Sequence, residues 1–346
     1  MNIRDRQSLF RSATDTLDRD GARLQQVLLL YLGIITALSL GASVLTVVLS
    51  EHIANTGGLR NLGLRSVLST AQTLLPLVQT IASIGLQIGY CTAALNALRG
   101  KSFSRDTLLG GFRRFFPMMW SYVLQSLLYV SLGITCIYLG TYIFMMLPMS
   151  APLQELMVPL MESFSVVSET ITVDAATVDA ITEALMPSLW FIAALFIPLL
   201  IPTIYRYRMA IYRIIDQPRP RAMLALRESR MMMQRNRFAL LKVDLNLWWY
   251  YGLQILIMLV CYGDSLLALL GVTLPWSPTV SYFLFLILSL VLQFVVFYFT
   301  MNRVTLVYAS AYESLIPDFE EKKQQLIERH TAMMQAKKPW TQEYEK

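Results

Sequence analysis

Four side chains between residues 219 and 244 are of types that bind phosphate: Arg227, Arg230, Asn236 and Arg237. A guanidinium presents a rigid fork of N–H donors that matches a phosphate group, and Lys and Arg clustered beside a membrane attract anionic lipid. The pattern therefore predicts contact with lipid headgroups or phosphate. The simpler interpretation is a helix that packs through one face, is solvated on the other, and attracts anionic lipid without specificity.

Polar side chains also repeat at helical spacing within an apolar segment, on one face: Ser69, Gln72, Gln79, Ser83 and Gln87. Together with Asp264, near the outer end of a later segment, they could line a polar path for a solute. Glutamine and serine in such segments more often bond neighbouring helices, and Asp264 could equally accept hydrogen bonds at the adjoining turn. Ion-coupled transport normally leaves a charged residue in mid-span, and no apolar segment has one there.

Motifs of catalysis are missing from the sequence. It contains no phosphate-binding loop, dinucleotide fingerprint, zinc-protease motif or nucleophile elbow. The two histidines, His52 and His330, lie at or beyond opposite ends of apolar segments, and the three cysteines occupy three different segments. We therefore predict no enzyme, no cofactor and no metal site.

Long apolar segments must position all these residues. Of the 346 residues, 55% are hydrophobic and only 15% are charged, and the mean hydropathy is +0.50. A bilayer core needs about 20 apolar residues per helix. The sequence predicts an all-α membrane protein with six transmembrane helices, over residues 24–49, 68–97, 118–146, 187–206, 245–269 and 279–302.

Charge between these segments predicts their orientation. Alternate connections, together with both termini, hold 27 of the 29 Lys and Arg residues. The loop 147–186 has six acids and no base. Because cytoplasmic loops are rich in Lys and Arg, we expect a multi-pass protein of the bacterial inner membrane with both termini in the cytoplasm. The basic residues then indicate topology, and no nucleic-acid partner is expected.

The chain divides into an amphipathic cytoplasmic arm over 1–23, a transmembrane domain over 24–312 and a polar cytoplasmic tail over 313–346. We expect the arm to lie on the inner leaflet and to end at Asp20 and Gly21, before the first span. A single amphipathic helix is predicted over 219–244, running into the fifth span. A similar basic connection follows the second span, so an internal duplication of helix-pair units is a further prediction.

The segment 202–251 resembles a bacterial integral-membrane family known only as domain of unknown function nine hundred and seventy-five. The similarity lies in these residues: Pro202, Arg206, Tyr207, Met209, Ala210, Tyr212, Asp216, Pro218, Ala225, Leu226, Ser229, Arg230, Met233, Asn236, Asp244 and Leu245. Arg235 and Asn246 depart from the Gly and Ser that the family pattern has there. The resemblance implies a motif turn marked by Tyr207, Asp216, Pro218 and Ser229, but no reaction.

Asp216 and Pro218 have two interpretations within that turn. Asp216 could accept hydrogen bonds from the following backbone amides while Pro218 fixes the turn. Alternatively, Asp216 could pair with an arginine that gates a movement.

The function predicted from the sequence is a non-enzymatic membrane scaffold or accessory component. It would contact anionic lipid headgroups, or a protein partner at the outer loop 147–186 or at the cytoplasmic helices. The alternative is a permease-like transporter or lipid-handling channel, and a membrane enzyme is a remote third.

Overall fold

The computed structural model describes residues 3, 5–55, 62–147, 150–151, 175–217, 219–269 and 275–342. Within these ranges the chain is helical and has no strand. Its helices are α1 (Arg6–Asn55), α2 (Leu62–Leu98), α3 (Arg105–Gly110), α4 (Phe115–Met145), α6 (Ala175–Tyr207), α7 (Ala210–Asp216), α8 (Ala222–Met233), α9 (Arg237–Asn246), α10 (Trp248–Cys261), α11 (Gly263–Leu269) and α12 (Pro278–Gln342). A 3₁₀ turn, η2 (Gly111–Arg114), joins α3 to α4.

The predicted all-α membrane fold is confirmed. Five helices are long and apolar enough to cross a bilayer: α1, α2, α4, α6 and α12. The sixth candidate is the pair α9 and α10, which is bent by 66°. Leucine, valine and tryptophan side chains are exposed along these helices, among them Leu127, Trp190 and Val295. Such an apolar surface is far larger than a water-soluble monomer exposes, so the protein spans a membrane.

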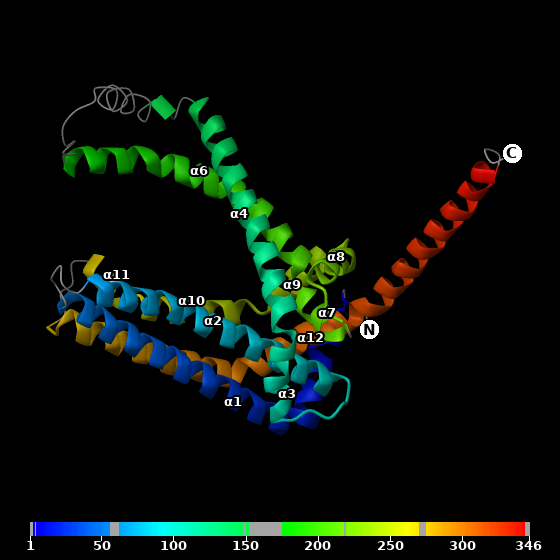
Figure 1. The fold of residues 1–346 in the computed structure, drawn as a ribbon, viewed down its shortest axis with the longest axis horizontal. Helices are drawn as coiled ribbons and strands as arrows, with labels where there is room; N and C mark the ends of the chain where they lie inside the picture. The colour runs from blue at the N-terminus through cyan, green and yellow to red at the C-terminus, as the bar shows by residue number, and fades with distance from the viewer. Residues whose placement is uncertain are drawn as a thin grey trace. The chain divides into compact units, whose positions relative to one another are not determined.

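The chain forms two compact units. Unit 1 contains Met1–Trp120 and Met209–Lys346, and unit 2 contains Ser121–Arg208. In unit 1, α1, α2 and α12 pack along one another and α10 packs on α12 (Figure 1). In unit 2, α4 and α6 meet where Phe144 lies 6.1 Å from Phe191 between ring centroids.

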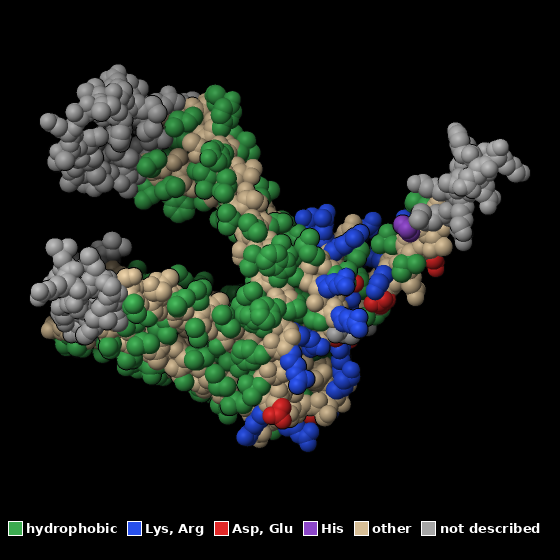
Figure 2. All heavy atoms as spheres, viewed as in Figure 1, with side chains coloured by type: hydrophobic (Ala, Val, Ile, Leu, Met, Phe, Trp, Pro, Cys, Tyr) green, Lys and Arg blue, Asp and Glu red, His purple; other side chains and the backbone are tan. Residues whose placement is uncertain are grey.

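Lys and Arg side chains gather at one end of unit 1, where α3, α7, α8 and the later part of α12 lie (Figure 2). We call this the basic end. The apolar parts of α1, α2 and α12 extend away from it. Two of the basic connections contain short helices. In the first, α3 and η2 follow the long helix α2; in the second, α7, α8 and α9 follow the long helix α6. The predicted duplication is not tested by this shared order and stays a prediction.

The predicted break at Asp20 and Gly21 is wrong, because α1 runs without interruption from Arg6 to Asn55. One glycine inside a helix costs only about 1 kcal/mol relative to alanine. Packing on both sides outweighs that cost, since Leu9, Ala13 and Leu24 are fully buried in unit 1. The described part of the arm therefore packs Leu9 and Ala13 into the protein, and its contact with the inner leaflet stays a prediction.

The predicted tail also begins too early. Leu315 and Phe319 are buried in unit 1, and α12 continues to Gln342. The residues just after 312 thus belong to the folded core at the basic end. Exposure becomes general only after Phe319, where polar residues dominate.

Close helix packing in unit 1 depends on glycine. A Cβ atom on Gly89 would lie 2.0 Å from the carbonyl oxygen of Leu108, and one on Gly111 would lie 2.2 Å from that of Gly85. Gly85 and Gly89 form a Gly-x-x-x-Gly pair on α2, a pattern that lets helix backbones approach closely. The backbones of α3 and η2 lie directly on this pair. After α2, Gly100 takes a positive φ of 65°, a conformation that glycine adopts readily and that ends the helix.

The single helix predicted over 219–244 is two helices. α8 ends at Met233, α9 begins at Arg237, and Arg235 between them has a positive φ of 72°. Glycine adopts this left-handed conformation without steric cost, whereas other residues do not. The turn therefore stores strain at Arg235, where the resembled family pattern has glycine.

Arg235→Gly is expected to stabilise the protein by roughly 0.5 to 1 kcal/mol. Relief of the left-handed strain exceeds the entropy that glycine loses on folding. Arg235→Val is the matched control, because it removes the same charge but places a β-branched side chain at positive φ, which is a strongly disfavoured combination. Thermal unfolding in mild detergent should rank glycine above arginine and arginine above valine. A valine variant as stable as the glycine variant would contradict the strain.

Candidate functional site

Charged side chains from four elements meet at the basic end of unit 1. Arg99 follows α2, Arg213 and Asp216 lie one turn apart on α7, Glu228 is on α8, and α12 contributes Tyr312, Glu313 and Lys323. We call these seven residues the charge network. Buried charged groups need partners, and the contacts below join these elements to one another.

Arg99 forms the first half of the charge network. Its Nη1 and Nη2 atoms donate to the two carboxylate oxygens of Asp216 at 2.7 and 2.8 Å. Its Nε atom donates to Glu313 Oε1 at 2.6 Å. The bonds to Asp216 raise the pKa of the Arg99 guanidinium above its ordinary value, although burial acts in the opposite direction. The guanidinium is therefore a permanent cation that ties the end of α2 to α7 and α12.

Arg213 and Glu228 form the second half and are more deeply buried, with side-chain exposures of 10% and 6%. Nε and Nη2 of Arg213 donate to Glu228 Oε2 at 2.9 and 2.6 Å, and Gln217 Nε2 donates to the same oxygen at 2.8 Å. The Arg213 guanidinium also lies 4.8 Å from the centroid of the Phe319 ring. A cation over an aromatic face is attracted by it, so α7 is fixed to both α8 and α12.

Tyr312 connects the two halves. Its hydroxyl donates to Asp216 Oδ2 at 2.6 Å and accepts from Arg213 Nη1 at 3.4 Å. The Tyr312 ring stacks on Tyr212 with centroids 5.2 Å apart. The hydrogen bonds thus run without interruption from Arg99 to Glu228, and such linked networks hold more strongly than isolated pairs.

The chemistry of the charge network is that of a structural interlock. Its three cations, Arg99, Arg213 and Lys323, match three carboxylates, Asp216, Glu228 and Glu313. Each of these carboxylates already accepts a charge-assisted contact, which makes it a poor general base. Among the described residues, no three His, Cys, Asp or Glu side chains gather as metal ligands. Removal of one partner from a buried ion pair is strongly destabilising, so the charge network keeps four elements in register.

The motif turn predicted from the sequence is assembled differently. Asp216 accepts from Arg99 and Tyr312 rather than from following amides, and Gln217 Oε1 instead accepts the backbone N–H of Arg221 at 3.2 Å. The alternative interpretation proposed an arginine partner, and Arg99 is that partner, whereas a gating movement stays a prediction. Ser229 is fully buried, Tyr207 ends α6 in unit 2, and Pro218 lies outside the described residues.

The residues of the predicted phosphate set differ in exposure, and their contact with phosphate stays a prediction. Arg227 and Arg230 are exposed on α8, whereas Asn236 is buried and its Nδ2 donates to the Met232 carbonyl at 3.1 Å. Arg237 is half-buried at the start of α9 and its Nε atom has no hydrogen-bond partner. The prediction assumed one continuous helix, whereas the turn at Arg235 divides these residues between α8 and α9.

The predicted polar path is in part a helix contact. Gln79 Nε2 donates to Ser39 Oγ at 2.9 Å and so joins α2 to α1. Gln72 and Gln87 also have interactions. Asp264 lies in α11, and its side chain is outside what the structure describes. Most of the outer loop 147–186, with its predicted partner surface, likewise lies outside the described residues.

A polar cluster deeper in unit 1 was missed by the sequence reasoning. Tyr90 donates its hydroxyl to Asn302 Oδ1 at 2.6 Å, and Asn302 Nδ2 donates to Gln25 Oε1 at 2.5 Å. Gln25 Nε2 in turn donates to the Tyr298 carbonyl at 3.1 Å. This cluster joins α1, α2 and α12. Single polar residues at the ends of apolar segments, such as Gln25 and Asn302, are the signal that could have found it.

Three comparisons with known proteins were made. No protein-family model, no curated protein and no solved structure matches it. Membership of the resembled family therefore remains a hypothesis that rests on the residues between 202 and 251.

Proposed function

We propose that this protein is a non-enzymatic component of a bacterial inner membrane that contacts anionic lipid through α9 and serves as a scaffold or accessory subunit. The observation that carries the proposal is the 66° bend between α9 and the apolar helix α10. A helix that turns sharply where a span begins is positioned to lie at headgroup depth. Interfacial helices of this kind bind through apolar side chains and cations together.

The exposed face of α9 has this composition. Leu240, Val243 and Leu247 are fully buried against the protein. The opposite side exposes Phe238 by 77% and Leu245 by 62%, and Trp248 at the start of α10 by 71%. Lys242 is exposed on the same side, one turn from each of the two apolar residues. Apolar side chains favour lipid, aromatic residues favour the interface, and the lysine favours anionic headgroups.

Orientation is part of the proposal, with both termini and the basic end in the cytoplasm. The distribution of Lys and Arg supports it. In a variant with alanine at the three native cysteines, a membrane-impermeant thiol reagent applied outside should label a cysteine at residue 174. It should not label one at residue 227. Labelling in the reverse pattern would overturn the orientation.

Lipid contact at α9 can be measured with a fluorophore on a cysteine at residue 245, in bilayer nanodiscs. Quenching by brominated phosphatidylglycerol should exceed quenching by brominated phosphatidylcholine at equal mole fraction. Lys242→Gln should lower that preference about fivefold, since one basic residue near an anionic surface contributes about 1 kcal/mol. The loss would show that the lysine, rather than the apolar face, selects the headgroup.

A fluorophore at residue 287, which is exposed on the apolar part of α12, is the matched control. Both brominated lipids should quench it equally. If neither lipid quenches the probe at residue 245, α9 does not lie at the membrane. If the two lipids quench that probe equally, α9 touches lipid without recognising charge. The bond between Gln79 and Ser39 supports helix packing, so we do not propose the transport alternative.

A further inference from the structure

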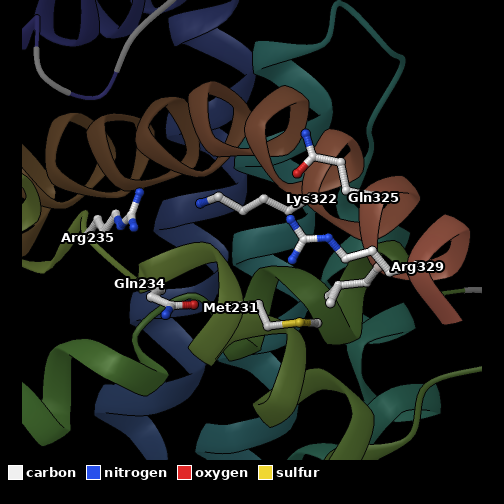
Figure 3. A pocket seen from close by; sticks show the side chains of 7 residues that line it. Met231, Gln234, Arg235, Lys322, Gln325 and Arg329 are labelled. Carbon is white, nitrogen blue, oxygen red and sulfur yellow. The ribbon is translucent and has the colours of Figure 1, made fainter. Parts of the chain in front are cut away.

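A cavity of about 400 Å³ lies between α8 and α12 at the basic end. Met231, Gln234, Arg235, Lys322, Gln325 and Arg329 line it (Figure 3), with Leu326 beside them. In Figure 3 the side chains of Lys322 and Arg329 extend from α12 on the side that faces Gln234. The lining thus holds three cations, two amides and no acid. We call it the α8–α12 pocket.

The three cations of the α8–α12 pocket have no carboxylate partner among the described salt bridges. Two acids on the same helices have other partners. Glu228 is bound by Arg213 and Gln217, and Glu321 accepts from Gln325 Nε2 at 3.2 Å without lining the cavity. Like charges around one cavity repel each other. An anion in the cavity would remove that repulsion.

Arg235 provides a second, independent observation. It occupies the strained left-handed turn, with φ of 72°, at a position where glycine would fold more easily. Strained residues are frequent at ligand-binding sites. Arg235 also lines a neighbouring cavity of about 260 Å³ together with Arg6, Phe238 and Lys242. The strained turn therefore places one cation between two basic cavities.

We propose that the α8–α12 pocket binds the phosphate group of a small anion, with Arg235, Lys322 and Arg329 as its cationic contacts. Arginine forks and a lysine ammonium are the usual partners of phosphate. Met231 and Leu326 give the cavity an apolar wall that fits a phosphate ester better than a bare ion. The site adjoins the lipid contact at α9 through Arg235 but does not depend on lipid being bound there.

The position of the pocket favours a soluble phosphate over a bilayer headgroup. The apolar run of α12 ends near Asn302, and Lys322 is 20 residues further along the same helix. That distance corresponds to a rise of about 30 Å. A phosphate ester from solution can therefore reach Lys322 and Arg329 directly, whereas Arg235 lies beside the α9 face proposed to contact lipid.

The test uses the purified full chain in detergent, with titration calorimetry at constant ionic strength. The soluble probes are inorganic phosphate and glycerol phosphate, and nanodiscs containing phosphatidic acid are the lipid probe. The double variant Lys322→Gln, Arg329→Gln should weaken binding of glycerol phosphate by about tenfold or more. Arg227→Gln, Arg230→Gln removes the same charge from exposed positions on α8 and should change binding by less than about twofold.

Arg235→Gly separates binding from folding. This variant should melt at a higher temperature than the parent chain and yet bind glycerol phosphate several-fold more weakly. Equal losses in the pocket pair and the exposed pair would show only general surface charge and would overturn the proposal. Binding confined to phosphatidic acid nanodiscs would identify a lipid as the source of the phosphate. No binding of any of the three probes would also overturn it, whatever the result at α9.

Discussion

Gly89→Ala is expected to lower the free energy of unfolding by about 3 kcal/mol or more. The new Cβ would lie 2.0 Å from the Leu108 carbonyl oxygen, which is a backbone atom and cannot rotate away. Overpacking usually costs about 1 to 3 kcal/mol when side chains can adjust, and here two helix backbones must separate. As a consequence, α3 and η2 should no longer pack on α2, close to the turn that carries Arg99. Thermal unfolding in detergent, followed by tryptophan fluorescence, measures the loss.

Gly33→Ala and Gly41→Ala are the matched controls. Both glycines lie inside α1, and a Cβ there would have no atom within 4 Å. Alanine favours a helix over glycine by about 1 kcal/mol, so each control should leave stability unchanged or raise it slightly. A Gly89 variant as stable as these two would show that α3 does not pack on the Gly-x-x-x-Gly pair.

The apolar helices were predictable because their signal is local. When lipid surrounds a charge-free segment such as 24–49, its backbone N–H and C=O groups must form hydrogen bonds within the segment itself. No distant residue changes that requirement. The end of α2 at Gly100 was predictable for the same reason, since glycine takes the left-handed turn at little cost. Five of the six predicted spans therefore follow from composition alone, and the sixth does so if α9 and α10 form one bent span.

The breaks between helices were less predictable because packing decides them. Gly21 looks like a helix end, but buried Leu9 and Leu24 on either side keep α1 continuous. Arg235 looks like an ordinary helical residue, but it takes a positive φ and ends the predicted helix. In both cases tertiary contacts override the local preference by an amount that the sequence does not reveal.

The charge network could be predicted only as a set of unassigned charges. Arg99 and Asp216 are 117 positions apart, and both lie in basic connections whose arginines the orientation argument already explains. One hint existed, the alternative that Asp216 pairs with an arginine. The sequence did not indicate which arginine pairs with Asp216. It also did not indicate that Tyr312 joins this pair to Arg213 and Glu228, because both contacts depend on how the helices are placed in space.

Breaking the pair of Arg213 and Glu228 should cost about 3 to 5 kcal/mol, because one charge is left buried without its partner. Arg213→Met leaves the Glu228 carboxylate with Gln217 and with Lys323, whose Nζ lies 4.0 Å away. Glu228→Gln leaves the guanidinium over Phe319 without a carboxylate. Each single variant should therefore unfold at a clearly lower temperature than the parent chain. Asp20→Asn, at an exposed ion pair with Arg19, should change stability by less than about 0.5 kcal/mol.

The double variant Arg213→Met, Glu228→Leu distinguishes a coupled pair from two independent charges. Both desolvated charges are gone, and apolar side chains of similar size can fill the site between α7, α8 and α12. Replacement of a buried ion pair in this way is often neutral or even stabilising, so the double variant should be more stable than either single one. If the two losses simply add, the charges act separately, and the charge network is not the interlock of the basic end. Recovery of stability in the double variant would show that the ion pair mainly specifies how α7, α8 and α12 align. Apolar residues can hold these helices together but do not specify which side chains must meet.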